Sequence, residues 1–152
     1  MDLAARAFKA TINWSALRRP VEEEIERTLS RARRLNRLNN VTGAILLFPT
    51  HIVQWIEGEP AGVADTFECA RRDERVKEIE VIGDGAISHR LFQASWMFYS
   101  DCRAQGLVDM PDFLRREGDD GRKPEFSVIF EAMRRVASGL DGAYITRAAL
   151  MI

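Results

Sequence analysis

Residues 41–58 read VTGAILLFPTHIVQWIEG, two apolar runs joined by a Pro-Thr pair. The first run, 41–48, is nearly continuous and of strand length, which is typical of a strand covered on both faces. The second run, 51–58, alternates between two sets of residues, as a strand with two distinguishable faces does. Because Pro49 and Thr50 turn the chain between the runs, the stretch predicts a β-hairpin.

Amphipathic segments flank this hairpin on both sides. Residues 20–36 and 61–72 carry apolar residues at spacings of three and four, which predicts two helices. Alternation at 8–15 and 76–82 and aromatic residues at 95–100 predict three more strands. The order is βαββαββ, and right-handed crossovers place both helices on the same face of one sheet. The predicted fold class is therefore α+β, a ferredoxin-like sandwich.

The chain changes character beyond residue 100. Residues 110–117 predict a short helix, and 118–124 form a polar loop. Residues 125–138 carry a strong apolar stripe, which either the free sheet face or a partner subunit must cover. We therefore expect a domain at 1–100 and a C-terminal helical extension of the same domain at 101–152.

Composition excludes several classes of function. Hydrophobic residues make up 46% of the chain and charged residues 30%, as in an ordinary globular protein. A formal net charge of −1 gives no basic field, so we expect no nucleic-acid partner. No segment approaches the ~20 apolar residues of a membrane span, and the N-terminus has no apolar run of a signal peptide. We expect a cytoplasmic protein without membrane contact.

Catalytic and metal motifs are missing as well. The sequence contains no GxSxG, P-loop, GxGxxG or HExxH pattern. Cys69 and Cys102 stand far apart, outside any metal-ligand spacing. We expect no enzyme, no catalytic residues and no metal site.

Two carboxamide side chains occupy positions at which helix and strand periodicity predict apolar residues. Asn36 falls on the sheet-facing stripe of the first helix, and Gln54 lies between two isoleucines on one strand face. An unpaired buried amide costs roughly 1–3 kcal/mol, so each needs partners. The two amides either bond each other and cap the helix end, or bind a ligand such as a planar heterocycle with alternating donors and acceptors.

Four segments together resemble the BLUF family of flavin-binding blue-light sensors. They are NRLNNVTGAILLF at 36–48, IVQWIEGEPAGV at 52–63, RRDER at 71–75 and RLFQASWM at 90–97. The resemblance runs from about residue 8 to residue 100, so that 1–100 reads as a BLUF-like flavin-binding domain. It implies FAD as the cofactor, held between the two helices on the sheet.

The resemblance also implies roles for individual residues. Asn36 matches an asparagine that hydrogen-bonds the polar edge of the flavin ring, and Gln54 matches a glutamine that contacts the ring and reorients after light absorption. Arg75 matches a basic residue that interacts with the cofactor. Met97 matches a methionine that relays the glutamine switch.

One departure from the family concerns photochemistry. Where the family has a Tyr-x-Ser pattern whose tyrosine gives an electron and a proton to the excited flavin, this chain reads Asn13-Trp14-Ser15. A carboxamide at this position can hydrogen-bond Gln54, so Asn13 is a candidate cofactor-binding residue, but it has no accessible oxidation. Strand alternation would place Trp14 on the opposite face, so it does not replace the tyrosine. We expect weak or altered photochemistry.

Three functions remain open at this stage. The first is a BLUF-type FAD-binding blue-light sensor with a downstream protein partner and with a homodimer as one arrangement. The second is a flavin-free BLUF-fold interaction module. The third is a phosphate-directed enzyme on the same fold, acting through Arg71, Arg72 and Arg75, although arginines at a helix end are usually solvated.

Overall fold

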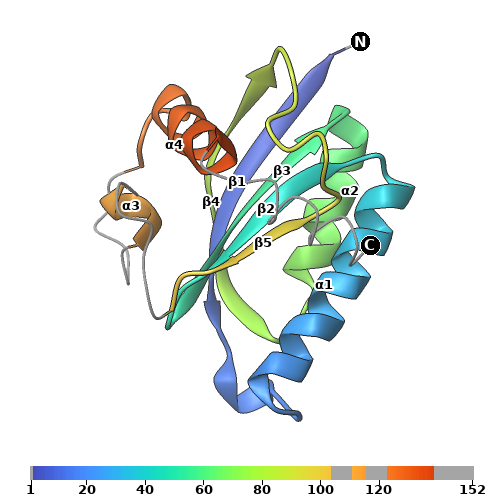
Figure 1. The fold of residues 1–152 in the computed structure, drawn as a ribbon, viewed down its shortest axis with the longest axis vertical. Helices are drawn as coiled ribbons and strands as arrows, with labels where there is room; N and C mark the ends of the chain where they lie inside the picture. Colours follow the sequence, from blue (N-terminus) through green and yellow to red (C-terminus); the bar gives the residue numbers. More distant parts are fainter. Residues whose placement is uncertain (1, 104–110, 116–122, 139–152) are drawn as a thin grey trace.

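The structure is a computed structural model and describes residues 2–103, 111–115 and 123–138 (Figure 1). In chain order the elements are β1 Leu3–Ile12, the 3₁₀ turn η1 Trp14–Ala16, α1 Val21–Leu38, β2 Thr42–Leu47, β3 His51–Gly58, α2 Pro60–Arg71, β4 Val76–Ile87, β5 Phe98–Asp101, α3 Asp112–Arg115 and α4 Phe126–Ser138. The predicted βαββαββ order and α+β class are confirmed.

The sheet is built around the predicted hairpin. Its strand order is β4-β1-β3-β2-β5, antiparallel except for the parallel pair β2 and β5. All six residues of β2 are buried, as its unbroken apolar run predicted. In the hairpin Ile45 lies opposite Gln54, and on the other side of β3 Phe8 lies opposite Gln54. This register places Gln54 in the middle of the sheet.

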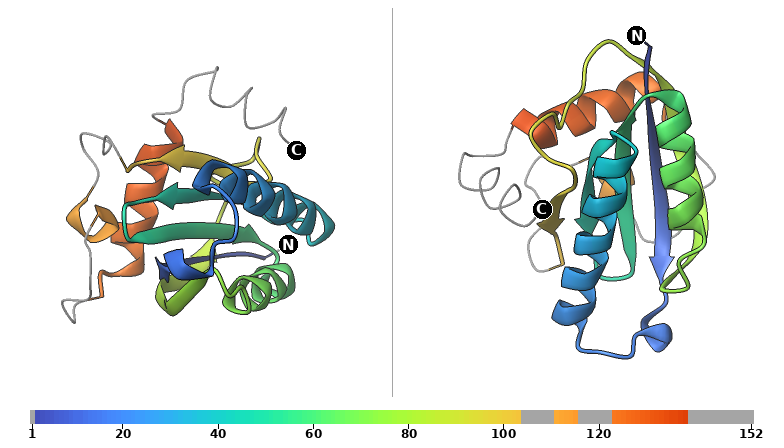
Figure 2. Two further views of the ribbon diagram at one scale, coloured as in Figure 1. Left: turned by 90° about the horizontal axis from the view of Figure 1, so that it is seen from below. Right: turned by 90° about the vertical axis from the view of Figure 1, so that its right-hand side faces the viewer.

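The helices divide between the two faces of the sheet. Figure 2 shows α1 and α2 on one face and α4 on the other. Phe8, Ile45 and Met97 belong to the apolar cluster under α1 and α2. Trp55 and Ile129 belong to the cluster under α4, where the Trp55 ring stacks on Phe126 with centroids 5.9 Å apart. The apolar stripe predicted at 125–138 is thus covered by the sheet.

Strand β4 is longer than the predicted 76–82, because it continues through Gly83 and Gly85 to Ile87. A Cβ atom on Gly83 would lie 2.5 Å from Cδ1 of Ile129, and one on Gly85 would lie 2.8 Å from Cδ2 of Phe126. Glycine in a strand often marks such a close approach. These glycines therefore let α4 pack closely on the sheet.

Strand β1 differs from its prediction at both ends. It begins at Leu3 because its alanine-rich start pairs with β3 and β4 on its two sides, a pairing that alanine's weak strand propensity did not predict. It ends at Ile12: the Asn13 N–H still donates to the Arg75 carbonyl at 2.8 Å, but the Ser15 hydroxyl donates to the Asn13 side chain at 2.8 Å and the chain turns into η1. Trp14 therefore lies in a 3₁₀ turn, outside any strand alternation.

Within the three described ranges, no helix is both long and apolar enough to cross a membrane.

The packing of α4 leads to a stability prediction. Ile129 is fully buried against the sheet, whereas its neighbour Val128 is 48% exposed. Ile129→Ala should lower the free energy of unfolding by about 2–5 kcal/mol, because it leaves a cavity. Val128→Ala should change it by no more than about 0.5 kcal/mol. Urea denaturation measures both, and equal small losses would mean that α4 does not cover this face in solution.

Candidate functional site

A cavity of about 360 Å³ lies between the sheet and the helices α1 and α2. Its floor comes from β1, β2, β3 and β5, and its walls come from α1 and α2. Most lining residues are apolar; uncharged polar groups come from Asn36, Gln54, Thr28 and Thr66, and charged ones from Glu24, Arg31, Asp73 and Arg75. Cofactor sites have volumes of roughly 300–1,000 Å³ with this mixture of an apolar lining and a small number of polar groups.

Asn36 lines the cavity from α1. Its side chain is fully buried, and its amide Nδ2 donates a hydrogen bond to the backbone carbonyl of Trp96. Its carbonyl Oδ1 is buried too, and no described residue donates to it. A buried acceptor without a partner costs free energy. Asn36 therefore offers one hydrogen-bond acceptor beside the cavity.

Gln54 presents a second amide from the sheet. It is 6% exposed and lines the cavity at the centre of the floor. No described residue hydrogen-bonds its side chain, and Asn36 bonds Trp96 rather than Gln54. The amide pairing that the sequence left open is thus not found. The amide of Gln54 keeps donors and an acceptor for a ligand.

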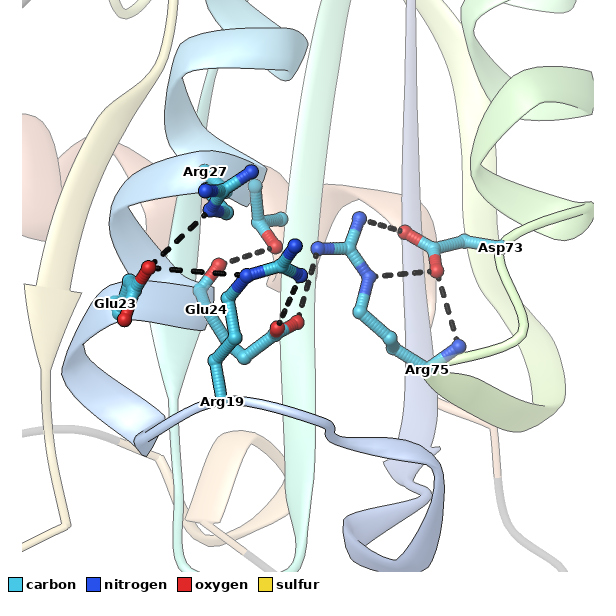
Figure 3. Close-up of polar contacts among 7 residues, drawn as sticks. Arg19, Glu23, Glu24, Arg27, Asp73 and Arg75 are labelled. Carbon is cyan, nitrogen blue, oxygen red and sulfur yellow. Dashed lines mark hydrogen bonds and ion pairs between the residues drawn. The ribbon is translucent and has the colours of Figure 1, made fainter.

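Hydrogen bonds and ion pairs connect charged residues around Glu24 and Arg75 (Figure 3). Arg75 lines the cavity, and its guanidinium lies 2.7 Å from the Asp73 carboxylate and 3.6 Å from the Glu24 carboxylate. Arg19 contacts the other oxygen of Glu24 at 3.3 Å. Burial opposes ionisation of Asp73, but hydrogen bonds from Arg75 outweigh it and lower the pKa of that carboxyl. Arg75 is therefore near the expected cofactor but already paired within the protein.

Met97 is fully buried in the cluster beneath α1 and α2 and does not line the cavity. Its backbone carbonyl accepts a hydrogen bond from Nε of Arg33 at 3.0 Å. Arg33 is 2% exposed, and burial lowers its pKa. Helix α1 thus holds two successive carbonyls before β5, that of Trp96 through Asn36 and that of Met97 through Arg33.

Asn13 lies outside the cavity, contrary to the position expected for a residue facing Gln54. Its Nδ2 donates to the Glu74 carbonyl at 3.3 Å, and its Oδ1 accepts from Ser15. The last β1 residue that lines the cavity is Ile12. Trp14 also lines it, which corrects the alternation argument that placed Trp14 on the opposite face.

Tyr99 lines the cavity from β5 and was not predicted. The signal that could have found it is strand periodicity, because Tyr99 follows Met97 by two residues and so shares its face. Burial, followed by the negative charge of Asp101, raises the pKa of Tyr99 to about 12. The phenol is therefore neutral at physiological pH.

The segment between β4 and β5 is also held from the opposite face of the sheet, by Glu57. The Glu57 carboxylate is fully buried and accepts the backbone N–H groups of Leu91 at 2.6 Å and Phe92 at 2.8 Å. The Arg90 guanidinium donates to the carbonyls of Asn40 at 2.8 Å and Glu57 at 3.3 Å. Glu57 thus positions this segment.

The structure shows no metal centre in the ranges it describes. No group of three or more His, Cys, Asp or Glu residues there is arranged to hold an ion. Both cysteines are free thiols, Cys69 exposed and Cys102 buried.

Comparison with known proteins places the chain among light sensors. A family model described as "BLUF: Sensors of blue-light using FAD" matches residues 10–98. A search of curated proteins finds no match. Among solved structures, BlsA in its ground state has a TM-score of 0.72 at 18% identity, covering 93% of this chain and 92% of that one. BlrB, a BLUF protein in its dark state, has a TM-score of 0.70 at 23% identity, covering 91% and 98%.

A longer chain also contains the same fold. Klebsiella pneumoniae BlrP1 has a TM-score of 0.61 at 19% identity, and the match covers 95% of this chain but 33% of BlrP1. At these identities the solved structures establish a shared fold.

Glu57 generates a prediction about pH. Burial is the main cause that raises its pKa from 4.5 to about 7. Between these values the folded chain binds a proton that the unfolded chain has lost, so the free energy of unfolding falls as pH rises. Glu57→Gln removes this titration and should flatten the decline, which amounts to at most about 3 kcal/mol.

Urea denaturation at pH 5 and pH 8 measures the difference between wild type and variant. Glu59→Gln, at an exposed carboxyl two residues along, serves as the control and should keep the wild-type slope. If wild type and Glu57→Gln share one slope, Glu57 does not titrate in this window.

Proposed function

The chain belongs to the BLUF family, and from this premise we propose that it binds FAD in the cavity between α1 and α2 and acts as a blue-light sensor. The observation that carries the proposal is the buried Oδ1 of Asn36, an acceptor without a partner among the described residues, beside a cavity of cofactor size. BLUF is a family of sensors, and we propose no enzymatic activity for this chain.

The cavity suits the ring system of a flavin. The polar edge of that ring carries an imide N–H flanked by carbonyl oxygens. The Asn36 Oδ1 supplies the acceptor that the imide requires, and the Gln54 amide supplies donors for the carbonyl edge. Apolar floor residues such as Phe8 and Ile45 give the aromatic rings a dry surface. When bound, the flavin supplies absorption of blue light and one-electron chemistry.

The identity of the flavin rests on the family description, which names FAD. One BlrP1 structure contains FMN according to its description. The contacts at Asn36 and Gln54 concern the ring, which FAD and FMN share. Arg75 would meet a charged group only by giving up contacts to Asp73 or Glu24. An Arg75 that stays paired within the protein does not bind a charged group of a cofactor. This observation favours the second function, a flavin-free interaction module.

We further propose that the photochemistry is altered relative to a member with the first-strand tyrosine. The position at the end of β1 that faces the cavity is Ile12, and its neighbour Asn13 points elsewhere. Neither side chain is oxidised by an excited flavin. Output to a protein partner and formation of a homodimer stay predictions of the family resemblance.

FAD binding by single variants distinguishes the residues that line the cavity from a residue outside it. Asn36→Ala and Gln54→Ala should each weaken FAD binding about tenfold or more, since each removes hydrogen bonds worth about 1–3 kcal/mol. Asn13→Ala, outside the cavity, is the control and should keep the wild-type Kd within about twofold. Titration with FAD measures Kd, and wild type should also gain melting temperature with FAD.

A wild type that stays colourless and gains no thermal stability at saturating FAD would favour the interaction module. Equal Kd values for Asn36→Ala and Asn13→Ala would remove Asn36 from the binding site.

Restoring a phenol tests which β1 residue faces the ring. Ile12→Tyr should place an oxidisable ring in the cavity and enhance a reversible, light-induced red shift of the flavin spectrum. Asn13→Tyr, one residue along and outside the cavity, should not. Difference spectra under blue light distinguish the two, and the opposite pattern would show that Asn13 is the cavity-facing position.

A further inference from the structure

Tyr99 is the phenol that the structure places at the cavity. The sequence has two tyrosines, Tyr99 and Tyr144, and Tyr144 lies outside the described residues. Tyr99 is half-buried on β5, the edge strand beside β2. Trp14 is the other oxidisable aromatic side chain among the lining residues.

Strand register places Tyr99 in one row with Gln54. Gln54 of β3 lies opposite Ile45 of β2, and Ile45 lies opposite Tyr99 of β5. Phe8 extends the row on the other side of Gln54. All of these residues line the same cavity, so their side chains share the face under α1 and α2. Neighbouring strands lie about 4.8 Å apart, so the backbones at Gln54 and Tyr99 are about 10 Å apart, with Ile45 between them.

Asn36 is anchored to the segment that leads into β5. Its Nδ2 is bonded to the carbonyl of Trp96, three residues before Tyr99. On β1 the residue opposite Gln54 is Phe8, six positions before Trp14. Trp14 follows the far end of β1, beyond Ile12, and belongs to the other end of the cavity near Arg75. A ring that contacts Gln54 therefore lies nearer to Tyr99, which shares its row, than to Trp14.

We propose that Tyr99 is the electron donor to the photoexcited flavin, in place of a phenol on the first strand. The inference rests on the proposed function, because it needs a bound flavin. Tyr99 loses one electron and its phenolic proton to the flavin and takes both back in the dark. The flavin is reduced while the phenol is oxidised, the return restores both, and no further oxidant or reductant takes part.

The chemical state of Tyr99 agrees with this role. A phenol whose pKa is raised to about 12 keeps its proton at neutral pH and has one to transfer. Asp101 and Glu22 contribute negative charge to this environment, while Arg103 contributes positive charge.

The test uses the fluorescence lifetime of FAD bound to the full chain. Electron transfer from an aromatic donor quenches the excited flavin, so removal of the donor lengthens the lifetime. Tyr99→Phe removes only the hydroxyl and should lengthen the lifetime several-fold while the dark Kd for FAD stays within about twofold. Tyr99→Trp restores an oxidisable ring and should shorten the lifetime again. Trp14→Phe is the matched control and should keep the wild-type lifetime.

The outcomes separate this inference from the proposed function. If titration in the dark shows that wild type binds no FAD, both fail. If FAD binds and Tyr99→Phe keeps the wild-type lifetime, the flavin site stands and the role of Tyr99 is overturned. A longer lifetime in Trp14→Phe alone assigns the donor to Trp14 and equally overturns it.

Discussion

The hydrogen bond from the Asn36 amide to the Trp96 carbonyl fixes the arrangement of the candidate site. Asn36 is also held through its backbone, whose carbonyl accepts the Val41 N–H at 2.8 Å. With one Nδ2–H committed to Trp96, the side chain keeps the Oδ1 acceptor, and that atom is buried beside the cavity. Helix α1, the start of β2 and the entry to β5 thus converge on one residue. A ligand that donates to Oδ1 completes this arrangement.

The segment from Arg90 to Met97 connects the cavity to the opposite face of the sheet. Asn36 and Arg33 hold its later carbonyls from the helix side. The Glu57 carboxylate holds its earlier N–H groups from the other side. Glu57 follows Trp55, which stacks on Phe126 of α4. A change in what Asn36 bonds is thus linked by successive contacts to the surface that α4 covers.

Hydrophobic periodicity in the sequence predicted the structural features that depend on local residue spacing. The hairpin, both helices and the α4 stripe follow from apolar spacing, and Asn36 and Gln54 were found because polar residues stood at apolar positions. The sequence placed Asn13 inside the first strand, but the strand ends before it. The Asn13 side chain instead bonds the distant Glu74 and the nearby Ser15, and strand periodicity does not encode these bonds. Tyr99 was missed because an aromatic residue in a strand reads as core. The pairing of Arg75 with Glu24 joins residues 51 positions apart, which no local pattern encodes.

The central claim is that Asn36 Oδ1 accepts a hydrogen bond from the flavin ring. Its most direct measurement is NMR of the complex with FAD labelled with ¹⁵N at the imide nitrogen. We predict a bound imide proton that is protected from exchange in wild type and loses that protection in Asn36→Ala. A tightly bound FAD whose imide proton exchanges with water as fast as in free FAD would contradict the account.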